Sequence, residues 1–127
     1  MSRKSFNEAV DDASFLVAKG RFIGDRTRQK ILRREHVDKL TNAILKVLAA
    51  HGKARIRAIG MYARLNALDA AEQATSLCRV NTGLRLCIEI EKEKGNIGDL
   101  RDETHIQDVD AWVFIITFFK EKTDDSN

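Results

Sequence analysis

The sequence predicts an α/β (α+β) fold, a two-layer sandwich with its helices on one face of a sheet, in the order β-α-β-α-β-β after an extra N-terminal helix. Three observations predict it. Apolar residues recur every three or four positions over residues 34–51 and again after Gly60, which is the spacing of a helix. They alternate strictly over residues 53–59 and 84–91, which is the spacing of a half-buried strand. Residues 109–119 are apolar on both faces, which is typical of a strand inside a sheet.

The chain is predicted to hold one folded domain. Its 127 residues, 43% of them hydrophobic, are enough for one buried core but not for two. We expect an N-terminal helix and a basic linker over residues 1–28, the folded domain over residues 29–120, and a short disordered tail over residues 121–127.

The N-terminal segment is predicted to form a short amphipathic helix. Ser5 and Glu8 have the spacing of a capping box, and Gly20 gives a C-terminal stop. The apolar residues at helical spacing between them are Phe6, Val10, Ala13, Leu16 and Val17. The following residues are basic and contain Gly24, which predicts a loop. A short strand is expected around Gln29–Arg33.

A helix and a strand are predicted next. The helical spacing runs from Arg34 to His51, and Gly52 stands where a left-handed cap residue is favoured. In the strand over residues 53–59, one face carries Ala54, Ile56 and Ala58, and the other carries Lys53, Arg55 and Arg57. We therefore expect a half-buried strand with a cationic outer face.

Gly60 is predicted to allow a tight reversal into a helix that lies close to the sheet. The alanines that would permit the close approach are Ala63, Ala67, Ala70, Ala71 and Ala74. The stripe expected along one side of this helix is Leu65, Leu68, Ala71, Thr75 and Cys78. Packing alone would account for this composition.

Two strands joined by a hairpin complete the predicted sheet. The residues of the first strand expected to face inward are Leu84, Leu86, Ile88 and Ile90. A loop over Lys94–His105 leads to the apolar segment Ala111–Phe119. A strand that is apolar on both faces lies either inside a sheet or with one face in a subunit interface.

Charge is distributed unevenly along the chain. The net charge is only +3, but residues 19–57 hold twelve Lys and Arg against three acids, a local +9. Residues 80–127 hold six basic and eleven acidic residues, a local −5. Such asymmetry is typical of a protein with a face that binds a polyanion, and a solvated surface with no ligand is the alternative.

The glycine turn and the helix after it resemble a motif of the Alba family of small nucleic-acid-binding proteins. The residues that carry the resemblance are Ala58, Gly60, Ala67, Leu68, Ala71 and Glu72, with one residue inserted between Met61 and Ala63. The closing segment, residues 105–119, is similar to the last strand of the Alba-type subunits of eukaryotic ribonuclease P. The resemblance covers roughly Gln29–Lys120 and implies the fold order β-α-β-α-β-β with a long final hairpin.

The resemblance also implies where nucleic acid would bind. In the family, the loop after the first strand carries a basic pair that contacts phosphate, and the matching residues are Lys30, Arg33 and Arg34. Contacts from the glycine turn would fall near Arg57, Met61, Tyr62 and Arg64. Tyr62 is a candidate for stacking on an unpaired base, or for packing at the helix start. Lys53 and Arg55 complete the outward strand face, and Arg101 is the interior cation of the hairpin loop.

Three departures from the family pattern favour RNA over a DNA-coating role. Ile59 and Met61 flank the glycine where archaeal DNA-binding members usually have arginines. The chain has no proline to open the first helix, and the hairpin loop is more acidic than basic. The eukaryotic RNA-associated branch accepts apolar residues beside the glycine.

The sequence offers no enzymatic or metal-binding motif. His36, His51 and His105 have no partner at a recognised spacing, and the acidic residues before the last strand are interpreted as a solubilising loop. Cys78 and Cys87 lack C-x-x-C spacing and are expected to be free thiols. We expect no enzyme activity, no cofactor and no metal. No apolar run approaches the length of a membrane helix and no signal peptide is recognisable, so an intracellular protein of the nucleus or cytoplasm is expected.

The function expected from these observations is low-specificity nucleic-acid binding through phosphate contacts. RNA is the expected ligand, with double-stranded DNA as the other candidate, and the resemblance implies a homodimer or a heterodimer with a related Alba-type chain, alone or within a ribonucleoprotein. The alternative is an assembly subunit that has an apolar dimer interface, formed by the last strand and the N-terminal helix, and no intrinsic affinity for nucleic acid.

Overall fold

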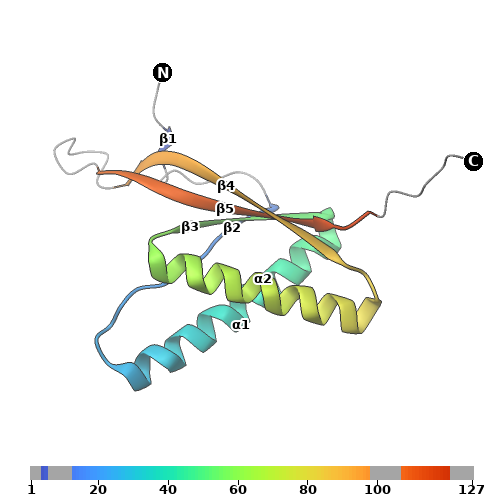
Figure 1. The fold of residues 1–127 in the computed structure, drawn as a ribbon, viewed down its shortest axis with the longest axis horizontal. Helices are drawn as coiled ribbons and strands as arrows, with labels where there is room; N and C mark the ends of the chain where they lie inside the picture. Colours follow the sequence, from blue (N-terminus) through green and yellow to red (C-terminus); the bar gives the residue numbers. More distant parts are fainter. Residues whose placement is uncertain (1–3, 6–12, 98–106, 121–127) are drawn as a thin grey trace, which may run out of the picture.

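The chain forms one mixed sheet covered on one face by two helices. The computed structural model describes residues 4, 5, 13–97 and 107–120. In chain order the elements are β1 (Lys4–Ser5), β2 (Phe15–Val17), α1 (Arg26–His51), β3 (Lys53–Ile59), α2 (Met61–Thr82), β4 (Leu86–Ile97) and β5 (Gln107–Phe118). Both helices lie on the same side of the strands (Figure 1). The predicted α/β sandwich of two layers is compatible with this arrangement.

The five strands lie side by side in the order β1-β4-β5-β3-β2. β5 is central and pairs antiparallel with both β3 and β4, whereas β2 runs parallel to β3 and β1 parallel to β4. Phe114 and Ile116 of β5 are fully buried, and Val113 on the opposite face is 2% exposed. Of the two interpretations of the last strand, a position inside the sheet is therefore confirmed.

The first strand is not where the sequence predicted it. Gln29–Arg33 belongs to α1, because Asp25 caps the helix by accepting hydrogen bonds from the backbone N–H groups of Thr27 and Arg28. The strand that precedes α1 is Phe15–Val17, which pairs with Arg55–Arg57 of β3. The expected domain boundary between residues 28 and 29 thus falls inside a helix.

The predicted N-terminal helix is wrong at its C-terminal part. Phe15, Leu16 and Val17 are extended, with Leu16 packed against the core and Val17 57% exposed. Three apolar residues in a row are too few to distinguish the periodicity of a helix from that of a strand. Pairing with β3 stabilises the extended conformation here. Residues 6–12 of the expected helix, and residues 121–127 of the expected tail, lie outside the described residues.

The small face of α2 is buried as predicted, but the stripe of larger residues is not. All five predicted alanines are at most 3% exposed, in a core with Ile44 and Leu48 of α1 and Ile56 of β3. Of the stripe expected along one side of α2, Ala71 and Cys78 are buried, whereas Leu65 and Leu68 are 41% and 47% exposed, so the five residues do not share one buried side. α2 contacts both α1 and the sheet, and the small residues occupy the side where these two neighbours meet.

Other predicted details hold in part. α1 ends where Gly52 donates its N–H to the Leu48 carbonyl, as expected for a cap residue. β4 is longer than predicted, since pairing with β5 continues through residues 94–97 into the expected loop. Leu84 and Ile90 are about half exposed rather than buried inward residues.

Candidate nucleic-acid interface

Cations gather at the end of the molecule where α1 and α2 begin. Between residues 18 and 34 every Lys and Arg is exposed: Lys19, Arg21, Arg26, Arg28, Lys30, Arg33 and Arg34. Asp25 is the one acid in this stretch. We call these seven cations the basic surface. They lie on the loop between β2 and α1 and on the first turns of α1, at the lower left of Figure 1.

The basic surface opposes the dipole of its own helix. The first turn of α1 contains no acidic residue but does contain Arg26 and Arg28. Cations near a helix N-terminus are unfavourable, by about 0.3–1 kcal/mol each when exposed. Asp25 offsets part of this repulsion as the N-cap. A bound anion would offset the rest, so the charge pattern favours an anionic ligand over a merely solvated surface.

The loop that carries part of the basic surface is held in place by hydrogen bonds and close packing. The side chain of Gln29 donates to the Arg21 carbonyl and accepts from the Ile23 N–H, both at 2.8 Å. The Lys19 carbonyl accepts a 2.7 Å hydrogen bond from Asn66 of α2. At Gly20 an added Cβ would lie 2.7 Å from the backbone of Tyr62, so only glycine fits this approach.

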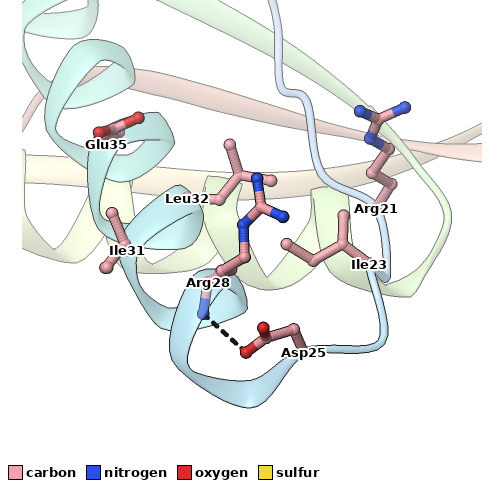
Figure 2. Close-up of a pocket in the computed structure, with 7 residues that line it drawn as sticks. All are labelled: Arg21, Ile23, Asp25, Arg28, Ile31, Leu32 and Glu35. Atoms are coloured by element: carbon pink, nitrogen blue, oxygen red, sulfur yellow. Dashed lines mark hydrogen bonds between the residues drawn. The ribbon is translucent and has the colours of Figure 1, made fainter.

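A groove between the loop and α1 holds two arginines. It has a volume of about 470 Å³, and its lining residues are Arg21, Ile23, Asp25, Arg28, Ile31, Leu32 and Glu35. Figure 2 shows the Arg28 guanidinium beside Leu32, with Ile23 between Arg28 and Arg21, and Asp25 bonded to the Arg28 backbone. Two guanidinium groups over an apolar floor suit a phosphate next to a flat apolar group.

Three of the predicted site residues meet in a second, smaller pocket. Lys30 and Arg33 of α1 and Tyr62 of α2 line it together with Gln29, Leu65 and Asn66, and its volume is about 130 Å³. Arg33 also forms an ion pair with Asp69 of α2. Arg34 is exposed on the same part of α1. The fold therefore brings Lys30, Arg33 and Tyr62 together, although the helix position of the two cations was not predicted.

The predicted cations of β3 lie elsewhere. Ala54, Ile56 and Ala58 face the helices, so the alternation puts Arg55 and Arg57 on the other face of the sheet. Arg57 is 2% exposed, and its guanidinium lies 3.3 Å from Glu93 and 4.6 Å from the centre of the Phe15 ring.

Arg55 is half-buried and also lies over Phe15, at 5.3 Å. The cationic outer face expected of this strand is thus reduced to Lys53, which is exposed. The Phe15 ring on the neighbouring strand β2 lies against both arginines, and Glu93 of β4 also pairs with Arg57.

Arg64 lines neither of these two pockets. Arg64 donates a 3.0 Å hydrogen bond to the Asp110 carbonyl and lies 4.8 Å from the centre of the Trp112 ring. These contacts direct it toward β5. Arg101 lies outside the described residues.

Sequence reasoning did not name Lys19, Arg21, Phe22, Arg26 or Arg28 as site residues. Phe22 is 67% exposed and stacks on Tyr62, with ring centres 5.8 Å apart. The signal was present as seven cations against one acid within seventeen residues. The charge was noted, but these residues were not named because the segment was divided between a linker and a strand.

Other kinds of site find little support in the part of the chain that the structure describes. There, no three His, Cys, Asp or Glu side chains are grouped to hold a metal ion. Cys78 and Cys87 are free thiols, the first buried and the second half-buried. None of the described helices has the length and apolar character needed to cross a membrane.

The chain matches no model of a known protein family and no curated protein. The resemblance to the Alba family therefore stays a hypothesis, based on the residues of the glycine turn and on the order of elements.

Proposed function

We propose that the protein binds nucleic acid, RNA in preference to double-stranded DNA, through the basic surface. The observation that carries the proposal is the set of seven exposed cations against one acid in residues 18–34. They lie on a loop and helix end that internal hydrogen bonds hold in place. Such a surface is typical of proteins that bind a polyanion.

The mechanism is neutralisation of backbone phosphates. Lysine and arginine side chains that contact phosphate displace condensed counterions, which makes affinity fall steeply with salt. Phosphate contacts position the ligand and carry little sequence information. Low sequence specificity follows. Arg21 and Arg28, which both line the groove of Figure 2, are candidates for contacts with phosphate.

The Alba hypothesis is consistent with binding at the basic surface if the first strand of the family fold is assigned to β2. From β2 onward the chain runs β2-α1-β3-α2-β4-β5, the succession expected of that family. On this hypothesis β2 is the first strand, and the loop after it carries Lys19 and Arg21 in place of Lys30, Arg33 and Arg34. The preference for RNA rests on the apolar neighbours of the turn glycine, Ile59 and Met61, on the absence of a proline at the first helix and on the acidic composition of residues 95–105.

The test compares two variants of equal charge. In the basic-surface variant the substitutions are Arg21→Gln, Arg28→Gln, Lys30→Gln and Arg34→Gln. In the far-end variant they are Lys46→Gln, Arg79→Gln, Arg85→Gln and Lys120→Gln, all at exposed positions. Fluorescence anisotropy would follow the binding of a structured RNA and a DNA duplex at low and near-physiological salt.

The proposal expects salt-sensitive binding, tighter for RNA, that is lost in the basic-surface variant and kept in the far-end variant. Equal losses in both variants would show that only net charge matters and would contradict a specific surface. Absence of binding by the unmodified protein at low salt would contradict nucleic-acid binding itself. Equal affinity for RNA and duplex DNA would contradict the preference alone.

A second candidate function is that of an assembly subunit, favoured by apolar side chains exposed near the end of α2. Leu77, Val80 and Leu84 are 39%, 81% and 51% exposed. Leu77 and Leu84 also line a largely apolar pocket of about 260 Å³ with Phe118. The last strand, expected earlier as the interface, is central in the sheet and buries Val113 and Phe114 within the chain.

The partner in this second candidate is another copy or a related chain, which corresponds to the dimer that the family resemblance implies. Sedimentation velocity on the isolated protein and on Val80→Lys tests the homodimer. A dimer that Val80→Lys dissociates, and that Met61→Lys at the other end of α2 leaves intact, would support it. If the protein is a monomer at all concentrations, the homodimer is contradicted, and the partner in this second candidate would be a different chain. A subunit with no role beyond assembly would not bind nucleic acid.

A further inference from the structure

Phe22 is a large apolar side chain displayed in the middle of the basic surface. Phe22 is 67% exposed. Arg21 precedes it in the chain, and the helix that follows carries further exposed cations. Its ring stacks on Tyr62 with an angle of 22° between the ring planes and 5.8 Å between the ring centres. Exposure of a phenylalanine ring to water is unfavourable. A ligand that covers the ring would therefore bind more tightly, because apolar surface is removed from water.

The backbone on both sides of Phe22 is fixed by one side chain. Gln29 bonds the carbonyl of Arg21 and the N–H of Ile23, the residues immediately before and after the ring. The close approach of Gly20 to Tyr62 holds the loop against α2 from the other direction. The ring is therefore presented in a defined position rather than on a free loop, which lowers the entropy cost of binding to it.

Cations accompany both of these aromatic residues. Tyr62 lines the smaller pocket with Lys30 and Arg33, and Arg21 is adjacent to Phe22 in the chain. A nucleotide combines a flat base with a phosphate. An aromatic ring can stack on the base, and the cations can contact the phosphate. In a duplex the base faces are covered by their neighbours in the stack, whereas an unpaired base has a face free to stack.

We infer that Phe22, supported by Tyr62, is a stacking platform for an unpaired base, and that the preferred ligand is single-stranded RNA or a single-stranded loop in RNA. This inference rests on the proposed function, because the neighbouring cations hold the phosphates that flank the base. It adds a substrate class, since phosphate neutralisation alone does not distinguish unpaired from paired strands.

The first experiment measures affinity for an unstructured RNA ten-mer and for the same sequence in a duplex. Phe22→Leu keeps an apolar side chain and removes the ring, and Phe22→Trp keeps a ring. Phe119→Leu is the matched control, because Phe119 is also exposed, at 50%, but at the other end of the molecule. We expect Phe22→Leu to weaken single-strand binding roughly tenfold, with duplex binding unchanged. Phe22→Trp and Phe119→Leu should bind like the unmodified protein.

A second experiment uses the unmodified protein and so does not depend on the folding of any variant. A 2-aminopurine base at successive positions of the ten-mer should lose fluorescence on binding at one position, where it stacks on the platform. An abasic residue at that position should cost the unmodified protein about tenfold in affinity and cost Phe22→Leu almost nothing.

The outcomes separate the two proposals. If both RNAs bind in a salt-dependent way but Phe22→Leu affects neither, or both equally, the platform is overturned and the basic surface stands. Unquenched 2-aminopurine at every position would also overturn the platform. If neither RNA binds at low salt, the proposed function fails and the platform fails with it.

Discussion

The guanidinium of Arg57 lies 4.6 Å from the centre of the Phe15 ring and pairs with Glu93 at 3.3 Å. The three residues come from β3, β2 and β4, so the contacts connect strands on both sides of β5. The Arg57 side chain is 3% exposed and that of Glu93 is 24% exposed. Arg57 therefore has the environment of a structural residue rather than of a phosphate ligand.

Substitution of Arg57 tests this assignment. Arg57→Gln removes a charge from a buried ion pair and should lower the free energy of unfolding by about 2–3 kcal/mol. The loss should not exceed the lower end of what is usual for breaking a buried ion pair, because Glu93 keeps some contact with water. Lys53→Gln, on the same strand and the same face but exposed, should change it by less than about 0.5 kcal/mol. Urea unfolding measures both. Equal effects would contradict a structural role for Arg57.

Enlarging an alanine on the buried face of α2 should destabilise the fold more than truncating a leucine next to it. Ala67 is fully buried, and Ala67→Leu should cost about 1–3 kcal/mol because the larger side chain pushes α2 away from its neighbours. Leu68 is 47% exposed, and Leu68→Ala should cost less than about 1 kcal/mol. Thermal unfolding of the two variants tests which face is buried. The reverse order would mean that the leucine side of α2 is covered.

Asp25 is expected to have opposite effects on stability and on RNA affinity. Its carboxylate caps α1, and Asp25→Ala should lower the free energy of unfolding by about 1 kcal/mol. The same change removes an acid that lines the groove with Arg21 and Arg28, so RNA affinity at low salt should increase. Asp25→Asn separates the effects, because asparagine is an equally good cap without charge. For Asp25→Asn we expect a stability close to that of the unmodified protein and a higher RNA affinity. An unchanged RNA affinity would argue against the location of the site.

Gly20 and Gly24 differ in why a side chain is unfavourable. At Gly20 an added methyl group meets the backbone of Tyr62 and Ala63 at 2.7 and 2.8 Å, whereas at Gly24 there is open space and a φ of 81°. Gly24→Ala should cost about 1 kcal/mol through backbone strain alone. Gly20→Ala should cost more and should also displace the loop, so single-strand RNA affinity should decrease as well. If the two variants behave alike, the loop is not held against α2 as described.

Long periodic segments were predictable from the sequence. The strand over residues 53–59 was placed with its bounds, because seven alternating residues between two glycines allow few alternatives. The burial of Ala63, Ala67 and Ala70 was foreseen because a helix of small residues favours close packing. Short segments were not predictable. Three residues, Phe15–Val17, carry too little pattern to distinguish a helix from an edge strand.

The candidate site was predictable in its charge but not in its geometry. The density of cations before residue 35 was visible, whereas Lys30, Arg33 and Arg34 were named from the resemblance to the Alba family. Alternation assigns Arg57 to the face opposite Ile56, but alternation does not reveal that Phe15 and Glu93 cover that face. The exposure of Phe22 depends on Gln29, seven residues later, and no local pattern indicates this contact.

The central claim is that the basic surface holds phosphates, and the salt dependence of binding tests it most directly. The dissociation constant for a single-stranded RNA would be measured at five or six salt concentrations for the unmodified protein, the basic-surface variant and the far-end variant. Each lost phosphate contact lowers the slope of log affinity against log salt by about 0.7 for a single strand. The account predicts a slope smaller by about 2–3 in the basic-surface variant and unchanged in the far-end variant. The same slope in all three proteins would contradict it.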